Sequence, residues 1–159
     1  MVRQSPRAAR HVFGPDEASD PKGREVDPEL ADHPNVQKYL QILQALKDQD
    51  LLALQSLLAT DAHIEMAGRN PFSGVYPGIG ASMALAGRTR RRFCGQTVRI
   101  DSADGDEVLA TVTVIVATPT GRTETFALRH RYAFRDGKAV SALVWAEDQE
   151  DFDAFLNEV

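Results

Sequence analysis

The stretch FALRHRYAF, residues 126–134, contains one histidine among apolar side chains. Alternation with a period of two places five side chains on one face of a strand: Phe126, Leu128, His130, Tyr132 and Phe134. Four of these five are apolar or aromatic, so we expect this face to point into a core. An imidazole there can exchange a proton near neutral pH or donate a hydrogen bond to an oxygen. Alternatively, His130 is a buried histidine satisfied by a backbone carbonyl or by a neighbour such as Tyr39.

The helices that must position such a residue come first in the chain. In HPNVQKYLQILQALKDQD, Pro34 or Asn35 can begin a helix, with Asn35 as its cap. Apolar side chains then recur at helical spacing and form one stripe: Val36, Tyr39, Leu40, Leu43 and Leu46. A second short helix, DLLALQSLLA, follows a polar interruption.

Strands dominate the second half of the sequence. AHIEMAG predicts a short strand with His63 and Glu65 on one face and Ile64 and Met66 on the other. RNPFSGVYPGIG indicates a loop because proline and glycine are dense there. The sequence then predicts a helix, four strands and a C-terminal amphipathic helix: about Gly80–Ala86, Gln96–Ser102, Glu107–Thr118, Arg122–Phe134, Ala139–Ala146 and the final EDQEDFDAFLNEV. Helices followed by hairpin-linked strands favour an α+β fold, with helices packed on one face of a strongly curved, mostly antiparallel sheet.

Composition excludes several classes of partner. The chain has 159 residues, of which 43% are hydrophobic and 26% charged, and its net charge is −5. This is typical of a soluble globular domain, and the modest negative charge gives no electrostatic case for nucleic acid. No apolar run approaches the ~20 residues that span a bilayer, and no secretory signal is recognised. We therefore expect neither nucleic acid nor a membrane as a partner.

Metal and cofactor motifs are also missing from the sequence. Cys94 is the single cysteine, which fits a reducing cytoplasm and excludes an internal disulfide. The histidines are never paired at i, i+4, and no phosphate-binding loop or dinucleotide fingerprint occurs. We expect no metal and no cofactor, and a cytoplasmic protein.

Residues 1–32 differ from the rest of the chain. They contain four prolines, mixed charges and only scattered apolar side chains. Such a segment buries too little surface to offset the entropy of ordering, so we expect a disordered tail before a single domain over 33–159.

Four segments together resemble the SnoaL-like branch of the NTF2-like superfamily. They are NVQKYLQIL, DLLALQSLLATDAHIEM, PFSGVYPGIGA and HRYAFRDGKAVSALVW, and the resemblance spans about residues 33–156. It implies a cone-shaped α+β barrel whose bent sheet and helices enclose a mostly apolar pocket. Members include ketosteroid isomerases, polyketide cyclases, epoxide hydrolases and dehydratases, so the fold alone does not choose the activity.

The resemblance suggests roles for two residues. Tyr39 resembles the tyrosine that donates a hydrogen bond to the substrate oxygen in ketosteroid isomerases, although it can also be a core aromatic. His130 lies near the position of the second oxygen-binding residue, which is an aspartic acid in those enzymes. His130 is therefore a candidate donor or general base, and we take His130 and Tyr39 as the candidate catalytic pair.

The sequence departs from the isomerases at the catalytic carboxylate. An ungapped match puts Met66 there, and methionine cannot move a proton. A one-residue shift would make Glu65 the base but would reverse the faces of the strand. Asp61 or His63 can also serve as the base.

The resemblance also implies pocket walls and a partner. We expect the following residues to line a substrate pocket: Met66, Phe72, Tyr76, Phe126, Leu128, Tyr132 and Trp145. Trp145 can instead be a dimer contact, since sheets of this family commonly pair through their outer face. The expected function is cofactor-free isomerisation, cyclisation, dehydration or hydration of a small, mostly apolar molecule by a homodimer. It can instead be a non-catalytic carrier of a hydrophobic ligand or a dimerisation module. In RTRRR, the arginines can hold an acidic ligand or form a solvated run after a helix.

Overall fold

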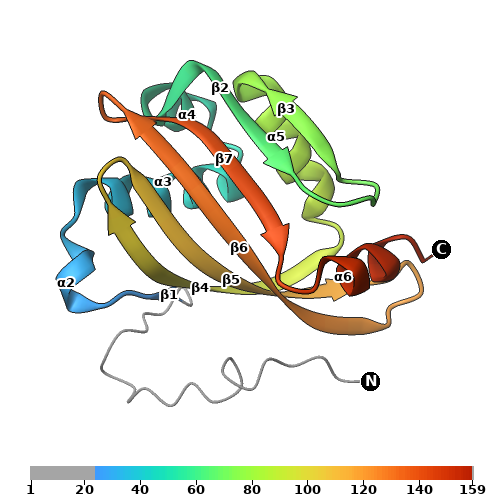
Figure 1. Ribbon diagram of the computed structural model, residues 1–159. Helices are drawn as coiled ribbons and strands as arrows, with labels where there is room; N and C mark the ends of the chain where they lie inside the picture. Colours follow the sequence, from blue (N-terminus) through green and yellow to red (C-terminus); the bar gives the residue numbers. More distant parts are fainter. Residues whose placement is uncertain (1–23, 159) are drawn as a thin grey trace.

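A bent seven-stranded sheet forms the body of the protein, seen here in a computed structural model that describes residues 24–158. The strand order is β1-β4-β5-β6-β7-β2-β3. Helices α3 (Pro34–Asp48), α4 (Leu51–Leu57) and α5 (Gly78–Thr89) lie together against one face of the sheet (Figure 1). Adjacent strands pair antiparallel except β1 with β4 and β2 with β7. The expected α+β fold with a curved, mostly antiparallel sheet is confirmed.

The five predicted strands are present in the predicted order but differ at several ends, and two further strands, β1 and β3, were not predicted. Their bounds are β1 Arg24–Glu25, β2 Leu58–Met66, β3 Gly74–Pro77, β4 Phe93–Asp104, β5 Glu107–Ala117, β6 Thr123–Arg135 and β7 Lys138–Ala146. The segment GVYP, predicted as loop, forms β3 and pairs antiparallel with β2. Its proline and glycine are tolerated because β3 is an edge strand. No helix of the described residues has both the length and the apolarity needed to cross a membrane.

Residues 24–32, predicted to belong to the tail, are part of the fold. Strand β1 pairs parallel with β4, and helix α2 (Pro28–Ala31) follows with Asp27 as its cap. Val26 and Leu30 pack against the core. Residues 24–32 therefore belong to the folded part of the chain, because a short edge strand and two apolar side chains hold this segment. The rest of the predicted tail, residues 1–23, lies outside the described residues.

Helix α3 presents Tyr39 to the sheet. His33 caps this helix by accepting a hydrogen bond from the Asn35 backbone N–H, so the cap lies two residues before the predicted Asn35. The apolar stripe is buried as expected, and Tyr39 is fully covered. Gln49, at φ 54°, ends α3 in the left-handed region, and Asp50 caps α4 at once. The tight α3–α4 turn thus fixes the stripe against the sheet.

The register of β2, β5, β6 and β7 defines two faces. His130 pairs with Ala110 on β5 and with Val144 on β7, and Val144 pairs with Met66 on β2. These four residues form one row across the inner face, toward the helices. Because side chains alternate along a strand, the neighbouring residue of β6, Arg129, points to the outer face.

Helix α6 (Gln149–Leu156) closes one end of the sheet with aromatic side chains. The ring centroids of Phe152 and Phe155 lie 5.2 and 5.4 Å from that of Phe126. Asp153 of the same helix accepts hydrogen bonds from the Arg69 backbone N–H and the Asn70 side chain, at 2.8 and 2.7 Å. The loop after β2 is therefore held against α6.

A glycine makes this close approach possible. Gly68 has φ +95°, a left-handed conformation that L-residues other than glycine rarely adopt. A Cβ atom at this position would also collide with Gln149 and Asp153 of α6. Any larger residue at position 68 would push the loop away from the helix.

Candidate functional site

Tyr39 and His130 are in direct contact. The Tyr39 hydroxyl, from α3, lies 2.9 Å from His130 Nδ1, on β6, and the two rings meet edge to face at 6.0 Å between centroids. Tyr39 is fully buried, whereas His130 is only half-buried. The structure therefore brings together the two residues singled out in the sequence, and part of the His130 side chain stays exposed.

Both members of the pair are neutral at pH 7. Burial lowers the pKa of His130 from 6.5 to about 4, because a charged imidazolium loses its hydration there. The pKa of Tyr39 is raised well above its ordinary value, mainly by burial and further by Tyr132 and Asp101. The pair thus consists of an uncharged imidazole and an intact phenol.

The Tyr39 hydroxyl fixes the tautomer of His130. Among residues 24–158 this hydroxyl has His130 Nδ1 as its one hydrogen-bond partner. A fully buried hydroxyl needs an acceptor, so Tyr39 donates to Nδ1 and the imidazole proton resides on Nε2. Within the described chain Nε2 makes no hydrogen bond. His130 is therefore a neutral donor with its N–H unused.

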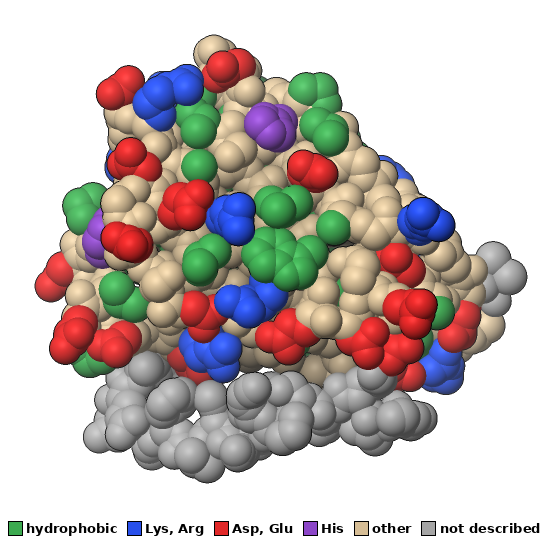
Figure 2. All heavy atoms as spheres, viewed as in Figure 1, with side chains coloured by type: hydrophobic (Ala, Val, Ile, Leu, Met, Phe, Trp, Pro, Cys, Tyr) green, Lys and Arg blue, Asp and Glu red, His purple; other side chains and the backbone are tan. Residues whose placement is uncertain are grey.

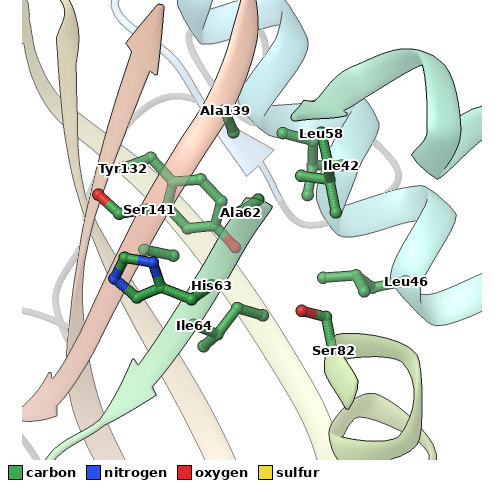
Figure 3. Close-up of a pocket in the computed structure, with 11 residues that line it drawn as sticks. Ile42, Leu46, Leu58, Ala62, His63, Ile64, Ser82, Tyr132, Ala139 and Ser141 are labelled. Atoms are coloured by element: carbon green, nitrogen blue, oxygen red, sulfur yellow. The ribbon is translucent and has the colours of Figure 1, made fainter. Parts of the chain in front are cut away.

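Tyr132 supports the pair from the same face of β6. Its ring centroid lies 4.8 Å from that of Tyr39 in an edge-to-face arrangement. Figure 3 shows the Tyr132 hydroxyl pointing into a hollow between strands β2 and β7 and the helices. The lining of this hollow includes Ile42, Leu46, His63, Ser82 and Ser141. Its volume of about 10 Å³ suits one water molecule and no substrate.

Met66 faces inward, in the row that contains His130. It is 8% exposed and lies two strands away from β6. Glu65 points to the opposite face, so the shifted match that would make it a base is not seen. Asp61 is exposed and lies 3.8 Å from Arg135, and His63 lines the water-sized hollow. Glu65, Asp61 and His63 therefore supply no carboxylate or imidazole beside His130.

The remaining pocket candidates divide into two groups. Leu128 is buried on the inner face beside His130. The second group lies away from His130 and consists of Phe72, Tyr76 and Phe126. Phe126 packs on α6, and the Tyr76 hydroxyl donates a hydrogen bond to the Phe72 carbonyl at 2.7 Å. They line the aromatic end of the fold instead of the Tyr39–His130 pair.

Trp145 was expected to line the pocket, but it lies on the outer face of the sheet. It pairs with Arg129 in the register of β6 and β7 and therefore lies on the outer face. The Arg131 guanidinium lies 6.0 Å from its ring centroid on that same face. Strand alternation, which places Val144 inside, necessarily places Trp145 outside.

Asp101 is an organising residue that sequence patterns did not reveal. It accepts hydrogen bonds from the Thr111 hydroxyl at 2.6 Å and from Arg99 at 2.9 Å, and Arg129 lies 3.6 Å away. A register shift between Ile100 and Ser102 breaks the alternation of β4 at this point. Simple periodicity therefore could not assign Asp101 to a face. Among residues 24–158, no three His, Cys, Asp or Glu side chains gather as a possible metal site.

Comparison with solved structures finds the same fold in other proteins. An NTF2-like protein from Burkholderia pseudomallei aligns with a TM-score of 0.64 and 18% identity, over 79% of this chain and 98% of that chain. TerC, crystallised with polyporic acid, aligns with a TM-score of 0.64 and 19% identity, over 79% and 99%. A protein from Jannaschia sp., assigned as a SnoaL-like polyketide cyclase, gives 0.62 and 14%, over 79% and 94%. At such low identities these likenesses show the fold.

Sequence comparison supplies the family. No curated protein matches the sequence. The family model of the SnoaL-like domain matches residues 36–142, a segment that includes Tyr39, Met66 and His130. This match covers most of the chain and agrees with the structural neighbours. The chain therefore belongs to the SnoaL-like family and has the NTF2-like fold.

Proposed function

We propose that this protein carries out cofactor-free chemistry on a small, mostly apolar molecule, with His130 Nε2–H as the donor to a substrate oxygen. The observation that carries the proposal is the half-buried imidazole whose Nδ1 is held by Tyr39 and whose Nε2 is unused. Tyr39 is then a positioning residue, because its hydroxyl fixes the tautomer and orientation of His130. This differs from the role expected from the sequence, in which Tyr39 itself binds the substrate oxygen.

The proposed reactions share one chemical need. Isomerisation, cyclisation, dehydration and hydration of carbonyl compounds develop negative charge on an oxygen. A preorganised donor in a dry site stabilises that charge, and removal of one such donor typically costs about 100- to 1,000-fold in rate. A neutral imidazole suits this role because it donates without the cost of burying a cation.

A non-catalytic carrier is the second candidate, and Met66 favours it. Met66 faces the interior where the isomerases have their proton-transferring carboxylate, and thioether sulfur cannot accept that proton. A protein with the oxygen donor but without the base would hold a carbonyl-bearing ligand unchanged. The two candidates share the ligand and differ in whether it is converted.

The test uses a variant pair that removes the chemistry and keeps the packing. Replacing both partners, Tyr39→Phe with His130→Phe, leaves no unpaired buried polar group, so the fold is expected to persist. Small apolar ketones and their matched hydrocarbons are screened by ligand-observed NMR against the native chain, the double variant and the control His63→Gln.

Preferential binding of ketones by the native chain and the control, lost in the double variant, supports the oxygen-donor site. Conversion of a bound ketone over time supports the enzyme, and binding without conversion supports the carrier. Equal binding of ketones and hydrocarbons by all three chains contradicts the proposed donor role of His130.

We also propose that two copies pair through the outer face of the sheet. Figure 2 shows apolar side chains at the centre of this face, among basic and acidic ones. Trp145 and Leu143 are half-buried there, and Ile115 is 43% exposed. Sedimentation should report about twice 17.5 kDa, and Trp145→Glu should reduce it to the monomer mass. A native chain that sediments as a monomer at micromolar concentration contradicts the proposal.

A further inference from the structure

A wide groove lies on the helical side of the molecule, apart from the Tyr39–His130 pair. It runs between the second half of α3, the end of α5 and the first half of β4, and its volume is about 340 Å³. Its floor is apolar, formed by Leu43, Leu46, Ala86, Phe93 and Val98. A hollow of this volume is in the range of small-molecule sites, whereas the hollow beneath Tyr132 is not.

The groove is positively charged in a protein of net charge −5. Arg24, Lys47 and Arg90 line it, and none of the lining residues within 24–158 is acidic. The Lys47 ammonium makes no ion pair or hydrogen bond with any residue of 24–158. Arg90 Nη2 donates to the Lys47 carbonyl at 2.7 Å, which places the guanidinium beside the end of α3. Most donors of these two side chains remain available.

The arginines of the run RTRRR differ in their surroundings, and not all of them line this groove. Arg88 donates to the Pro71 carbonyl at 2.9 Å and lies over Phe72, and Arg92 donates to the Ala117 carbonyl at 2.6 Å. Arg90 is the member of the run that lines the groove. Positive charge at the ends of α3 and α5 suits their dipoles, but dipoles do not explain an apolar floor beside that charge.

We infer that this groove binds an apolar anion, namely a carboxylate carried on an aromatic or aliphatic body. The carboxylate pairs with Lys47 and Arg90 at the rim, and the body covers the apolar floor. Guanidinium and ammonium groups are the usual partners of carboxylates. The site shares no lining residue with the Tyr39–His130 pair, so it goes beyond the proposed chemistry and does not depend on it.

Matched probes separate the charge from the apolar body. The dissociation constants of 2-naphthoate and of the uncharged 2-naphthamide are measured by titration calorimetry with the native chain. We expect 2-naphthoate to bind more tightly. The double variant Lys47→Gln with Arg90→Gln should weaken naphthoate binding by about three- to thirtyfold, as expected for the loss of two exposed ion pairs. Arg91→Gln, an exposed neighbour outside the groove, is the control and should leave binding unchanged.

Cys94 supplies an independent readout of position. It is the chain's one cysteine, its side chain is exposed, and it lines the groove. Bound 2-naphthoate should slow the alkylation of Cys94 by iodoacetamide, with the same concentration dependence as in the calorimetry. Filling the floor by Ala86→Leu should weaken both probes.

Three results would each overturn the inference. They are equal affinity for the carboxylate and the amide, an unchanged dissociation constant in the Lys47 and Arg90 double variant, and unaltered Cys94 alkylation at saturating probe. Because His130 takes no part, the variant Tyr39→Phe with His130→Phe should bind 2-naphthoate normally. Failure of the proposed oxygen-donor site is thereby distinguished from failure of the groove.

Discussion

Arg129 and His130 are neighbours on β6, yet they face opposite sides of the sheet and very different surroundings. On the outer face the Arg129 guanidinium lies 3.6 Å from the carboxylate of Asp101, although its Nε has no partner among residues 24–158. On the inner face His130 meets Tyr39, Tyr132 and apolar side chains, and its pKa is lowered to about 4. On the outer face the positive charge of Arg129 is balanced by the carboxylate of Asp101. On the inner face His130 is uncharged at neutral pH.

This difference indicates where a ligand can act. Charged side chains on the outer face lie beside opposite charges and most of them remain partly hydrated, so an added hydrogen bond gains little there. The inner face holds a neutral donor among aromatic and apolar side chains, where a hydrogen bond to developing charge contributes more. The predictions below test whether the two faces differ in this way.

The largest contrast is expected from truncating one aromatic residue on each face. Tyr39→Ala removes a fully buried ring and should lower the free energy of unfolding by about 3–5 kcal/mol. Trp145→Ala removes a half-buried ring on the outer face and should cost about 1–2 kcal/mol. Urea denaturation of both variants measures the difference, and equal losses would show that the inner face is not the better packed one.

A pH dependence should follow from the neutral state of His130. Its pKa is about 4 in the folded chain and near 6.5 when unfolded, so between these pH values the unfolded chain binds the extra proton. The free energy of unfolding should therefore fall as the pH falls from 6.5 to 4, by at most about 3 kcal/mol from this residue. Denaturation at several pH values measures the slope. The variant Tyr39→Phe with His130→Phe should have a shallower slope, and identical slopes would contradict a His130 imidazole that is neutral in the folded chain.

Breaking the pair from one side should have a smaller effect. Tyr39→Phe keeps the ring but leaves His130 Nδ1 without its donor, at a cost of about 1–2 kcal/mol. Adding His130→Phe should restore part of that loss, because no polar atom is then left unpaired. A double-mutant cycle by denaturation gives this coupling, and strictly additive losses would show that the 2.9 Å contact contributes nothing.

The smallest effect is expected on the outer face. In the monomer, Arg131→Gln removes an exposed guanidinium that lies 6.0 Å from the Trp145 ring centroid. The free energy of unfolding should fall by about 0.5 kcal/mol or less, and the apparent pKa of His130 should not change. NMR titration of the imidazole checks the second point, and a shifted titration would show that the two faces are coupled.

The inner face was predictable from sequence because its signals are local. Alternation in FALRHRYAF placed His130 inside, and helical spacing placed Tyr39 on the buried stripe of α3. Their contact at 2.9 Å joins residues 91 positions apart, and it matches the alternative in which His130 is satisfied by Tyr39, an alternative that periodicity alone does not give. Alternation in AHIEM placed Met66 on the face of Ile64, and the ungapped match to the isomerases placed Met66 at the site.

The features that sequence missed depend on long-range pairing or broken periodicity. Strand β1 is two residues long and is stabilised by β4, which lies far along the chain at Phe93–Asp104. Asp101 follows a register shift that alternation cannot see. The groove arises where α3, α5 and β4 meet, and no single segment of the sequence contains its lining. Local composition does not reveal contacts between distant segments. Residues 24–32 were assigned to the tail for this reason, although they contain β1 and α2.

The most direct test of the account is the ¹⁵N spectrum of the His130 imidazole at pH 7. The account predicts a neutral ring with an unprotonated Nδ1 that accepts from Tyr39 and a protonated Nε2, unchanged down to about pH 5. It also predicts that a bound ketone shifts the Nε2 resonance and not that of His63. A proton on Nδ1, or titration of the ring near pH 6.5, would contradict the claim that Tyr39 holds His130 as a neutral donor.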